Sequence, residues 1–418
     1  MLTPTEQLAL AHLDSDAMVA TLVELIGLAS TGGSTGEVAI QQVLADRLAD
    51  LDLAVDHWPL DLVALRGDPG YPGEEVDRSE AWGLVGSSTG SGVPALVLQG
   101  HVDVVPPGDR TAWTSEPFAA VVRDGELVGR GSCDMLGGVV AILAAVAAVR
   151  AAGVRLDETF AVHFVIGEED GGLGAFGTLE RGHRGAACII PEPTNLELVT
   201  GNAGALTFRI EVPGLATHGS TAWAGFSAID CYLPIHQALA ALQAKRNVDP
   251  EPLMTSYPVA YPLSVGKLQA GDWASSVPDQ LVAEGRLGLR ISEDPAAARA
   301  ELEDVVRDVA AADPFLRDHP PVVSWPGGQF RGGQLPTDHP LRDLVLAAHR
   351  AVTDTDTTEH GAPWGSDLRL YAGAGIPTVH YGPGDVSLAH GPDERVPIAH
   401  LLTTAQVLTL ALLRSCTA

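Results

Sequence analysis

The feature that most restricts the fold of this 418-residue chain is the alternation of short apolar runs with helical patterns. The segment at 139–152 is apolar enough for a buried helix, and it lies between two such runs. Strands that alternate with helices predict an α/β domain, with a mostly parallel sheet covered by helices on both faces. The runs assigned to buried strands span residues 95–99, 160–166, 186–190 and 378–381.

A different pattern begins after Pro193. Residues 206–212 and 280–291 alternate polar and apolar side chains, as half-exposed antiparallel strands do. Helical periodicity is found at 227–245 and again at 295–312. These patterns predict an inserted α+β domain with the ferredoxin-like element order β-α-β-β-α-β.

The predicted insertion spans residues 205–315 and divides the α/β domain into two parts. Residues 1–204 and 316–418 together are expected to form that domain, which would carry the chemistry. Within it, residues 63–91 are rich in Gly, Asp, Glu and Ser, and they predict a surface excursion.

Each predicted strand of the α/β domain runs into polar residues at its carboxyl end. In an open α/β sheet the ligand crevice lies at those ends. One more acidic residue precedes the glycines that open the helix at 139–152. The side chains expected to converge in the crevice are His101, Asp134, Glu168, Glu169, Glu192 and His390.

This set of side chains indicates a metal site. Four carboxylates packed together would repel one another and take up protons unless a cation offset them. Two histidines and several carboxylates, without a thiolate, suit zinc or another divalent metal. A carboxylate shared by two ions would make a dinuclear site that lowers the pKa of a bridging water and polarises a carbonyl.

Several motifs extend the pattern along nearly the whole chain. They are GHVDVVPPGD at 100–109, GRGSCDMLGG at 129–138, GEEDGG at 167–172, PEPT at 191–194, GLATHGS at 214–220, and GIPTVHYGPG with AHGPDE within 375–394. Together they resemble the dinuclear-zinc metallopeptidases and deacylases. That family includes acetylornithine deacetylase, succinyl-diaminopimelate desuccinylase, aminoacylase and carboxypeptidase G. Its fold is a zinc-exopeptidase-like catalytic domain with an inserted lid domain.

The resemblance implies two metal ions per chain and assigns their ligands. His101, Asp134 and Glu192 would hold one ion, and Asp134, Glu169 and His390 would hold the other. Asp134 would bridge the pair. Zinc is the expected metal, although cobalt and manganese also suit these ligands.

The resemblance also assigns roles around the ions. Glu168 would be the general base that takes a proton from the bridging water and returns it to the leaving amine. Asp103 would orient His101 through the other ring nitrogen, as ligating histidines usually require. A cis peptide bond is implied between Asp134 and Met135.

For the inserted domain, the resemblance implies a lid that mediates homodimer formation. His218 would reach the active site of the partner subunit and stabilise the oxyanion. Arg290 would grip a substrate carboxylate in a bidentate manner, with backbone donors from Gly382 and Gly384 nearby. Departures from the family pattern occur at Leu136, at Asp170 and near Ser275-Ser276.

Charge and cysteine content limit the partners and the location. The formal net charge is −28, which disfavours nucleic acid and anionic membranes as partners. The four cysteines form no CxxC pair, and the N-terminal residues lack the features of a signal peptide. A cytoplasmic location is therefore expected.

The function predicted from these observations is metal-dependent hydrolysis of the amide bond of an N-acylated amino acid. The PEPT motif and the GPG and AHGPDE segments favour a deacylase of the acetylornithine deacetylase or succinyl-diaminopimelate desuccinylase type. A dipeptidase or carboxypeptidase would use the same metals. A non-catalytic binding protein on this fold is the alternative from another class.

Overall fold

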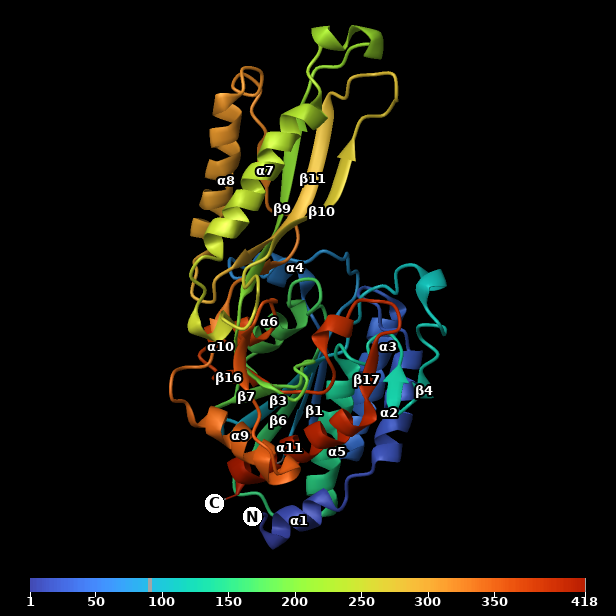
Figure 1. Cartoon of the computed structure of the whole chain (residues 1–418). Helices are drawn as coiled ribbons and strands as arrows, with labels where there is room; N and C mark the ends of the chain where they lie inside the picture. Colours follow the sequence, from blue (N-terminus) through green and yellow to red (C-terminus); the bar gives the residue numbers. More distant parts are fainter. Residues whose placement is uncertain (89–91, 418) are drawn as a thin grey trace. The chain divides into compact units, whose positions relative to one another are not determined.

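The computed structural model describes residues 1–88 and 92–417 and divides them into two compact units. The first unit comprises residues 1–201, 334–360 and 366–418, with residue 418 outside the described part. The second comprises residues 202–333 and 361–365. Figure 1 labels the helices and strands of both units.

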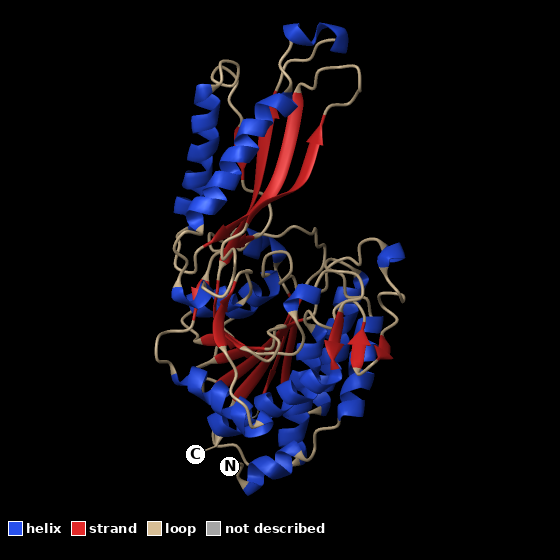
Figure 2. Ribbon diagram, in the orientation of Figure 1, coloured by secondary structure: helices blue, strands red, loops and turns tan. Residues whose placement is uncertain are grey.

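A nine-stranded mixed sheet forms the centre of the first unit (Figure 2). Its main path runs β1-β2-β6-β3-β7-β16-β8-β14, and β15 pairs with β8. The strands β6, β3, β7 and β16 are parallel to one another, whereas β1, β2 and β8 add in antiparallel fashion. The strands are β1 (Ala54–Pro59), β2 (Trp82–Ser87), β3 (Leu96–His101), β6 (Phe160–Val165), β7 (Cys188–Ile190), β8 (Leu198–Asn202), β14 (Gly333–Gln334), β15 (Glu359–Ala362) and β16 (Thr378–His380).

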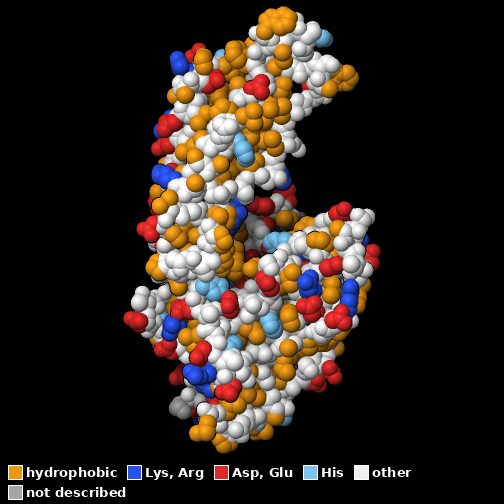
Figure 3. Space-filling view, viewed as in Figure 1, with side chains coloured by type: hydrophobic (Ala, Val, Ile, Leu, Met, Phe, Trp, Pro, Cys, Tyr) orange, Lys and Arg blue, Asp and Glu red, His pale blue; other side chains and the backbone are white. Residues whose placement is uncertain are grey.

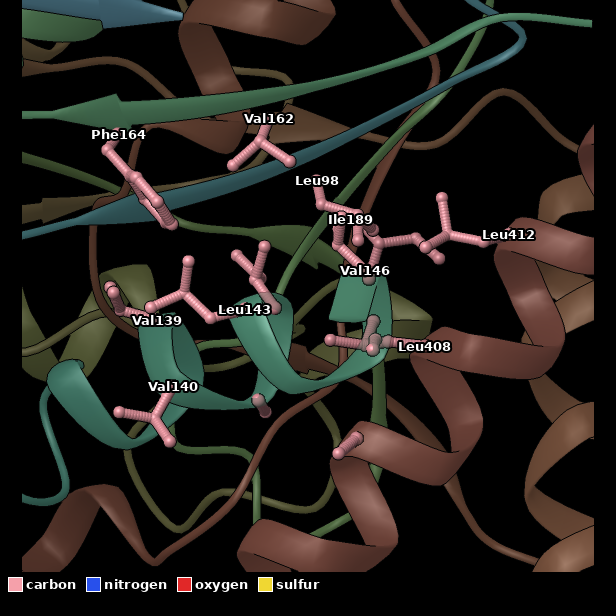
Figure 4. Close-up of a cluster of buried hydrophobic side chains, with 14 of the residues drawn as sticks. Leu98, Val139, Val140, Leu143, Val146, Val162, Phe164, Ile189, Leu408 and Leu412 are labelled. Carbon is pink, nitrogen blue, oxygen red and sulfur yellow. The ribbon is translucent and has the colours of Figure 1, made fainter. Parts of the chain in front are cut away.

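Helices cover both faces of this sheet. The central strands β3 and β6 are therefore buried on both sides. Alternate residues of β3 serve the two faces: Leu96 and Leu98 belong to the larger core, and Val97 belongs to the smaller one. Figure 4 shows α5 and α11 packed on the larger core. The helices of this unit are α1 (Pro4–Leu10), α2 (Ser15–Gly27), α3 (Thr35–Asp50), α4 (Leu62–Arg66), α5 (Leu136–Ala151), α6 (Leu173–Glu180), α9 (Pro340–Thr353), α10 (Leu368–Gly373) and α11 (Ile398–Cys416).

The helix α11 is long and apolar enough to cross a membrane by length and composition, but it packs against α5 and α9 in the core. A small three-stranded sheet, β17-β5-β4, joins distant segments of the chain. It consists of β4 (Val121–Arg123), β5 (Glu126–Val128) and β17 (Arg395–Pro397); the short 3₁₀ helices are η1 (Arg110–Ala112) and η4 (Val386–Leu388).

The second unit has two helices packed on an antiparallel sheet of five strands. The main strand order is β10-β11-β9-β12, and β13 also pairs with β9. The chain order β9-α7-β10-β11-α8-β12 is the predicted β-α-β-β-α-β pattern. The elements are β9 (Gly204–Pro213), η2 (Gly219–Ala224), α7 (Ala228–Arg246), η3 (Pro252–Met254), β10 (Leu263–Ala270), β11 (Gln280–Leu289), α8 (Pro295–Ala312), β12 (Val322–Ser324) and β13 (Gln329–Phe330).

The α/β class and the inserted α+β unit are as predicted, but three details differ from the prediction. The sheet of the first unit is mixed rather than mostly parallel, since β6, β3, β7 and β16 run parallel to one another whereas β1, β2 and β8 pair in antiparallel fashion. The second unit continues past residue 315 to residue 333, because β12 and β13 pair with β9 and complete its sheet. The segment 63–91 is not only a surface excursion: it contains the buried strand β2, which pairs with β1 and β6. The last part of that segment, residues 89–91, lies outside the described residues.

Candidate metal centre

Asp134 lies between two histidines in the first unit. Its Oδ1 is 3.1 Å from His101 Nε2, and its Oδ2 is 3.3 Å from His390 Nε2. Glu192 Oε2 lies 3.8 Å from the same nitrogen of His101, and Glu169 Oε2 lies 3.0 Å from the same nitrogen of His390. The two carboxylate oxygens of Asp134 thus face two separate groups of nitrogen and oxygen atoms.

Glu168 completes the cluster and is 7% exposed. Its ligand atom lies within 4.8 Å of those of His101 and Glu192. The ligand atoms of His101, Asp134 and Glu169 form a second group within the same limit. All six side chains expected to converge are therefore brought together, with His101 shared by the two groups.

Local structure explains these positions. His101 is the last residue of β3, and Glu168 and Glu169 follow β6 at the same edge of the sheet, because β3 and β6 are parallel. Asp134 and Met135 are joined by a cis peptide bond just before α5. The start of α5 lies so close to the strand end at Pro191 that a Cβ on Gly138 would be 2.2 Å from the Pro191 carbonyl oxygen.

Burial and mutual repulsion disfavour ionised carboxylates in this cluster. Burial raises the pKa of Glu168 and of Glu192 well above their ordinary values. Burial and the Asp134 charge raise the pKa of Glu169 to about 7. Burial alone would raise the pKa of Asp134 as well, but the contacts with His101 and His390 hold it far below its ordinary value.

The histidines respond in the opposite direction. Hydrogen bonds to Asp134 and Glu169 raise the pKa of His390 to about 11. Burial works to lower the pKa of His101, but the Glu192 charge and the Asp134 contact raise it well above its ordinary value. Protons thus stabilise the metal-free cluster, and a divalent cation would have to displace them.

The donor set fits a pair of divalent cations. Imidazole nitrogens and carboxylate oxygens are ligands for zinc and for neighbouring first-row metals. Bound metal cations would also offset the negative charges whose mutual repulsion raises the carboxylate pKa values. Asp134 is suited to bridge two ions because its two oxygens face different histidines.

Asp103 is placed close to its predicted position, but its contacts differ. The Nδ1 of His101 lies 2.9 Å from the backbone oxygen of Asp103 and 3.6 Å from its carboxylate. The carboxylate instead accepts the backbone N–H groups of Glu168, at 3.3 Å, and Glu169, at 3.2 Å. Asp103 therefore supports the histidine through its main chain and the glutamate turn through its side chain.

Two supporting residues were not identified from the sequence. Glu394 is 1% exposed and accepts the backbone N–H groups of Cys133 and Asp134 at 2.9 and 3.1 Å. Arg130 forms a buried ion pair with Glu394 and donates to the backbone oxygen of His390 at 3.1 Å. Arg130 lies in the motif GRGSCDMLGG and Glu394 in the motif AHGPDE. Their charges within these two motifs were the sequence signal that could have identified them as supports of the site.

The predicted backbone donors Gly382 and Gly384 are already in use. The Gly382 N–H donates to Thr194 Oγ1 at 2.9 Å, and the Gly384 N–H points to His400 Nδ1 at 3.5 Å. A Cβ on Gly382 would lie 2.3 Å from the Glu192 backbone oxygen. Gly382 is thus closely packed with its N–H engaged, and the donation of these two glycines to a substrate carboxylate stays a prediction.

The other two predicted residues, His218 and Arg290, belong to the second unit. His218 Nδ1 accepts the backbone N–H of Ser220 at 3.1 Å. Arg290 donates to the backbone oxygens of Asp249 and Arg246 at 2.9 and 3.0 Å. Two of the five Arg290 donors are thus occupied within its own unit, and the bidentate grip on a substrate carboxylate stays a prediction.

Comparison with known sequences gives extensive matches. The sequence model described as Peptidase family M20/M25/M40 matches residues 97–414. The succinyl-diaminopimelate desuccinylase of Xanthomonas oryzae pv. oryzae is 32% identical over 379 residues, which cover 87% of this chain and 90% of the relative. The N-formyl-4-amino-5-aminomethyl-2-methylpyrimidine deformylase of Bacillus subtilis is 28% identical over 401 residues, covering 88% and 87%.

Solved structures share the fold at lower sequence identity. Human carnosine dipeptidase 1 matches with a TM-score of 0.74 and 16% identity, and the match covers 98% of each chain. This likeness extends through both units of the chain.

Proposed function

Because this chain belongs to peptidase family M20/M25/M40, we propose that it is a dinuclear metal-dependent amide hydrolase that removes the acyl group of an N-acylated amino acid. The position of Asp134 between His101 and His390 carries the proposal. A carboxylate with one oxygen toward each histidine can bridge two metal ions, each held on its other side by one of the histidines.

The ligand sets follow from this geometry. His101, Asp134 and Glu192 would hold one ion, and Asp134, Glu169 and His390 the other, with zinc the expected metal and cobalt or manganese acceptable. When bound, the pair would polarise the scissile carbonyl and lower the pKa of a nearby water.

Glu168 would move the proton. Its carboxyl lies close to His101 and Glu192, where it can reach a water held at the proposed ions. It would take a proton from the attacking water as the new C–O bond forms, and it would then deliver that proton to the leaving amine as the tetrahedral intermediate collapses and its C–N bond breaks.

His218 is proposed as a hydrogen-bond donor to the developing oxyanion. Since its Nδ1 accepts from the Ser220 backbone, the neutral ring carries its proton on Nε2. A fixed N–H donor of this kind stabilises a developing negative charge.

A second substrate class is favoured by a specific observation. The two Arg290 contacts and the Gly382 contact engage groups expected to bind a substrate carboxylate. A relative named as a deformylase acts, by its name, on an N-formyl aminopyrimidine. An N-acylated amine without a carboxylate is therefore the second candidate, ahead of a dipeptide.

A matched substrate panel tests the proposal. The metal-loaded protein is assayed with N-acetyl-ornithine and N-succinyl-diaminopimelate, with the carboxamide analogue of each, with an N-formyl aminopyrimidine and with dipeptides. We expect hydrolysis of acylated compounds, and the ratio between each acid and its carboxamide reports whether the carboxylate is recognised. Absence of turnover for every compound would refute the hydrolase proposal.

We further propose that the second unit forms a homodimer. Its strand β10 ends the sheet, and an edge strand offers backbone groups to another chain. Apolar side chains of the unit are exposed, including Leu268 at 54% on β10 and Leu233 at 51% on the helix α7, which packs beside β10. Figure 3 shows hydrophobic side chains spread over the surface of this unit. A second copy could continue the sheet and cover these side chains.

Charge placed on this surface should separate the dimer. The double substitution Leu233→Glu and Leu268→Glu is expected to convert dimer to monomer in sedimentation velocity, because buried charges without partners of opposite sign are costly. Val63→Glu is the control, since Val63 is 83% exposed and lies in the first unit. A double variant that sediments like the unchanged protein would contradict the assignment of this surface.

A cytoplasmic location remains part of the proposal. All four cysteines are free and buried, which suits a reducing compartment. Fractionation of cells that express the intact chain would test it.

A further inference from the structure

Arg78 is a buried cation in the segment that the sequence assigned to the surface. Its side chain is 0% exposed. Buried arginines require partners for both charge and donors. The partners of Arg78 come from two distant parts of the first unit.

The contacts of Arg78 form a network. Its Nη2 donates to Glu37 Oε1 at 2.9 Å and its Nε to Glu37 Oε2 at 3.0 Å, a bidentate pair with helix α3. Its Nη1 donates to Asp170 Oδ2 at 2.9 Å. The same Asp170 oxygen accepts the backbone N–H groups of Glu75 at 3.1 Å and Val76 at 2.9 Å.

Asp170 is part of the turn that carries the two glutamates of the proposed site. This turn, residues 167–172, begins and ends in left-handed glycines: φ is +67° at Gly167 and +93° at Gly172. The Arg78 segment packs directly on it. A Cβ on Gly167 would be 3.4 Å from Arg78 Cζ, and a Cβ on Gly171 would be 2.1 Å from the Gly73 backbone oxygen.

The turn is therefore held from two sides. Asp103 accepts the backbone N–H groups of Glu168 and Glu169, and Asp170 is anchored by Arg78 and the 75–76 backbone. The far end of the turn also has contacts of its own, because Arg369 Nη2 donates to the Gly171 backbone oxygen and the Gly172 N–H donates to the Gly167 carbonyl. Arg78 is the side chain that pairs with the Asp170 carboxylate, so it adds the positive charge next to the middle of the turn.

We propose that Arg78, clamped by Glu37, is a positioning residue that fixes the 167–172 turn so that Glu168 and Glu169 face the proposed metal pair. This inference rests on the proposed function, because its test measures metal binding at the proposed centre. It adds a requirement outside the ligand set: the loop before β2 must be docked for the site to have its geometry. Arg78 touches neither substrate nor metal in this role.

The test uses two variants. Arg78→Met removes the charge and keeps most of the side-chain volume. Arg78→Lys keeps the charge but loses the planar guanidinium that donates two hydrogen bonds to Glu37. Cobalt(II) binding is followed by the visible absorption of the ion, which reports its coordination geometry, and kcat and KM are measured with the best substrate. We expect Arg78→Met to lose about 10- to 100-fold in cobalt affinity and kcat, as loss of a residue supporting a metal ligand does, with a changed spectrum and little change in KM. Arg78→Lys should be intermediate.

Arg246→Met is the matched control. Arg246 is also a buried arginine, 5% exposed, and it is paired with Glu293 and Glu301 in the second unit. This variant should lose thermal stability and keep the cobalt spectrum and kcat of the unchanged protein. A merely structural role of Arg78 predicts the same behaviour for Arg78→Met.

The outcomes are distinct. A folded Arg78→Met with unchanged spectrum and kcat overturns the inference. If Arg78→Met does not fold, a folded Arg78→Lys with unchanged spectrum and kcat overturns it as well. If the unchanged protein itself binds no cobalt, the proposed metal centre fails, and that result is separate from any effect of Arg78.

Discussion

Replacing Glu168 by glutamine is expected to lower kcat by about 10²- to 10⁴-fold, the range that a positioned general base contributes. The amide has the shape of the carboxyl but cannot accept and return a proton. Glu168 is buried, and burial raises its pKa well above the ordinary value, so the substitution removes a proton carrier and leaves no new buried charge. Metal content measured by atomic absorption should stay that of the unchanged protein.

Two companion variants make this result specific. Glu169→Gln should lose metal as well as activity, because Glu169 contacts His390 at 3.0 Å in the second proposed ligand set. Glu180→Gln should change neither, since Glu180 is exposed at the end of α6. A Glu168→Gln protein that keeps its metal and most of its turnover would remove Glu168 from the proposed chemistry.

The substitution Asp134→Asn is expected to have the largest effect on metal binding. Asp134 contacts both histidines, and the charge on its two oxygens would be shared by both ions. Its loss should lower metal affinity by more than the roughly 10- to 100-fold typical of a supporting residue, and hydrolysis should be lost with the metal. Metal titration of the apo protein by calorimetry measures the first effect directly.

Asp50→Asn provides a control of the same chemical change, because Asp50 is exposed at the end of α3. It should bind metal as the unchanged protein does. If Asp134→Asn bound two ions with undiminished affinity, Asp134 could not be the bridging ligand, and the site would have to be rebuilt around other carboxylates.

The central strands and the residues at their carboxyl ends could be predicted because both signals are local. Neighbouring residues alone set three of these features: the apolar run that ends in His101, the GEED segment after β6 and the helix after Asp134. Parallel strands then bring their carboxyl ends to one edge. Convergence of His101 with Glu168 and Glu169 therefore followed from the parallel order of β3 and β6.

The supports of the site could not be predicted in the same way. Arg78 meets Glu37 and Asp170, and Arg130 meets Glu394, across long stretches of chain. A charged residue in a Gly-rich segment has the same local pattern whether it is solvated or buried. The composition of residues 63–91 indicated a surface, but packing placed β2 and Arg78 inside.

The sequence by itself determined the fold class, the order of elements in the inserted unit and the chemistry of the six clustered side chains, because periodicity and residue type carry that information. Only the tertiary structure decided which backbone donors were already used, as at Gly382, and where the inserted sheet was completed, at β12 and β13. Hydrogen-bond partners and buried ion pairs depend on distances between residues far apart in the chain. Folding sets those distances, and no local pattern encodes them.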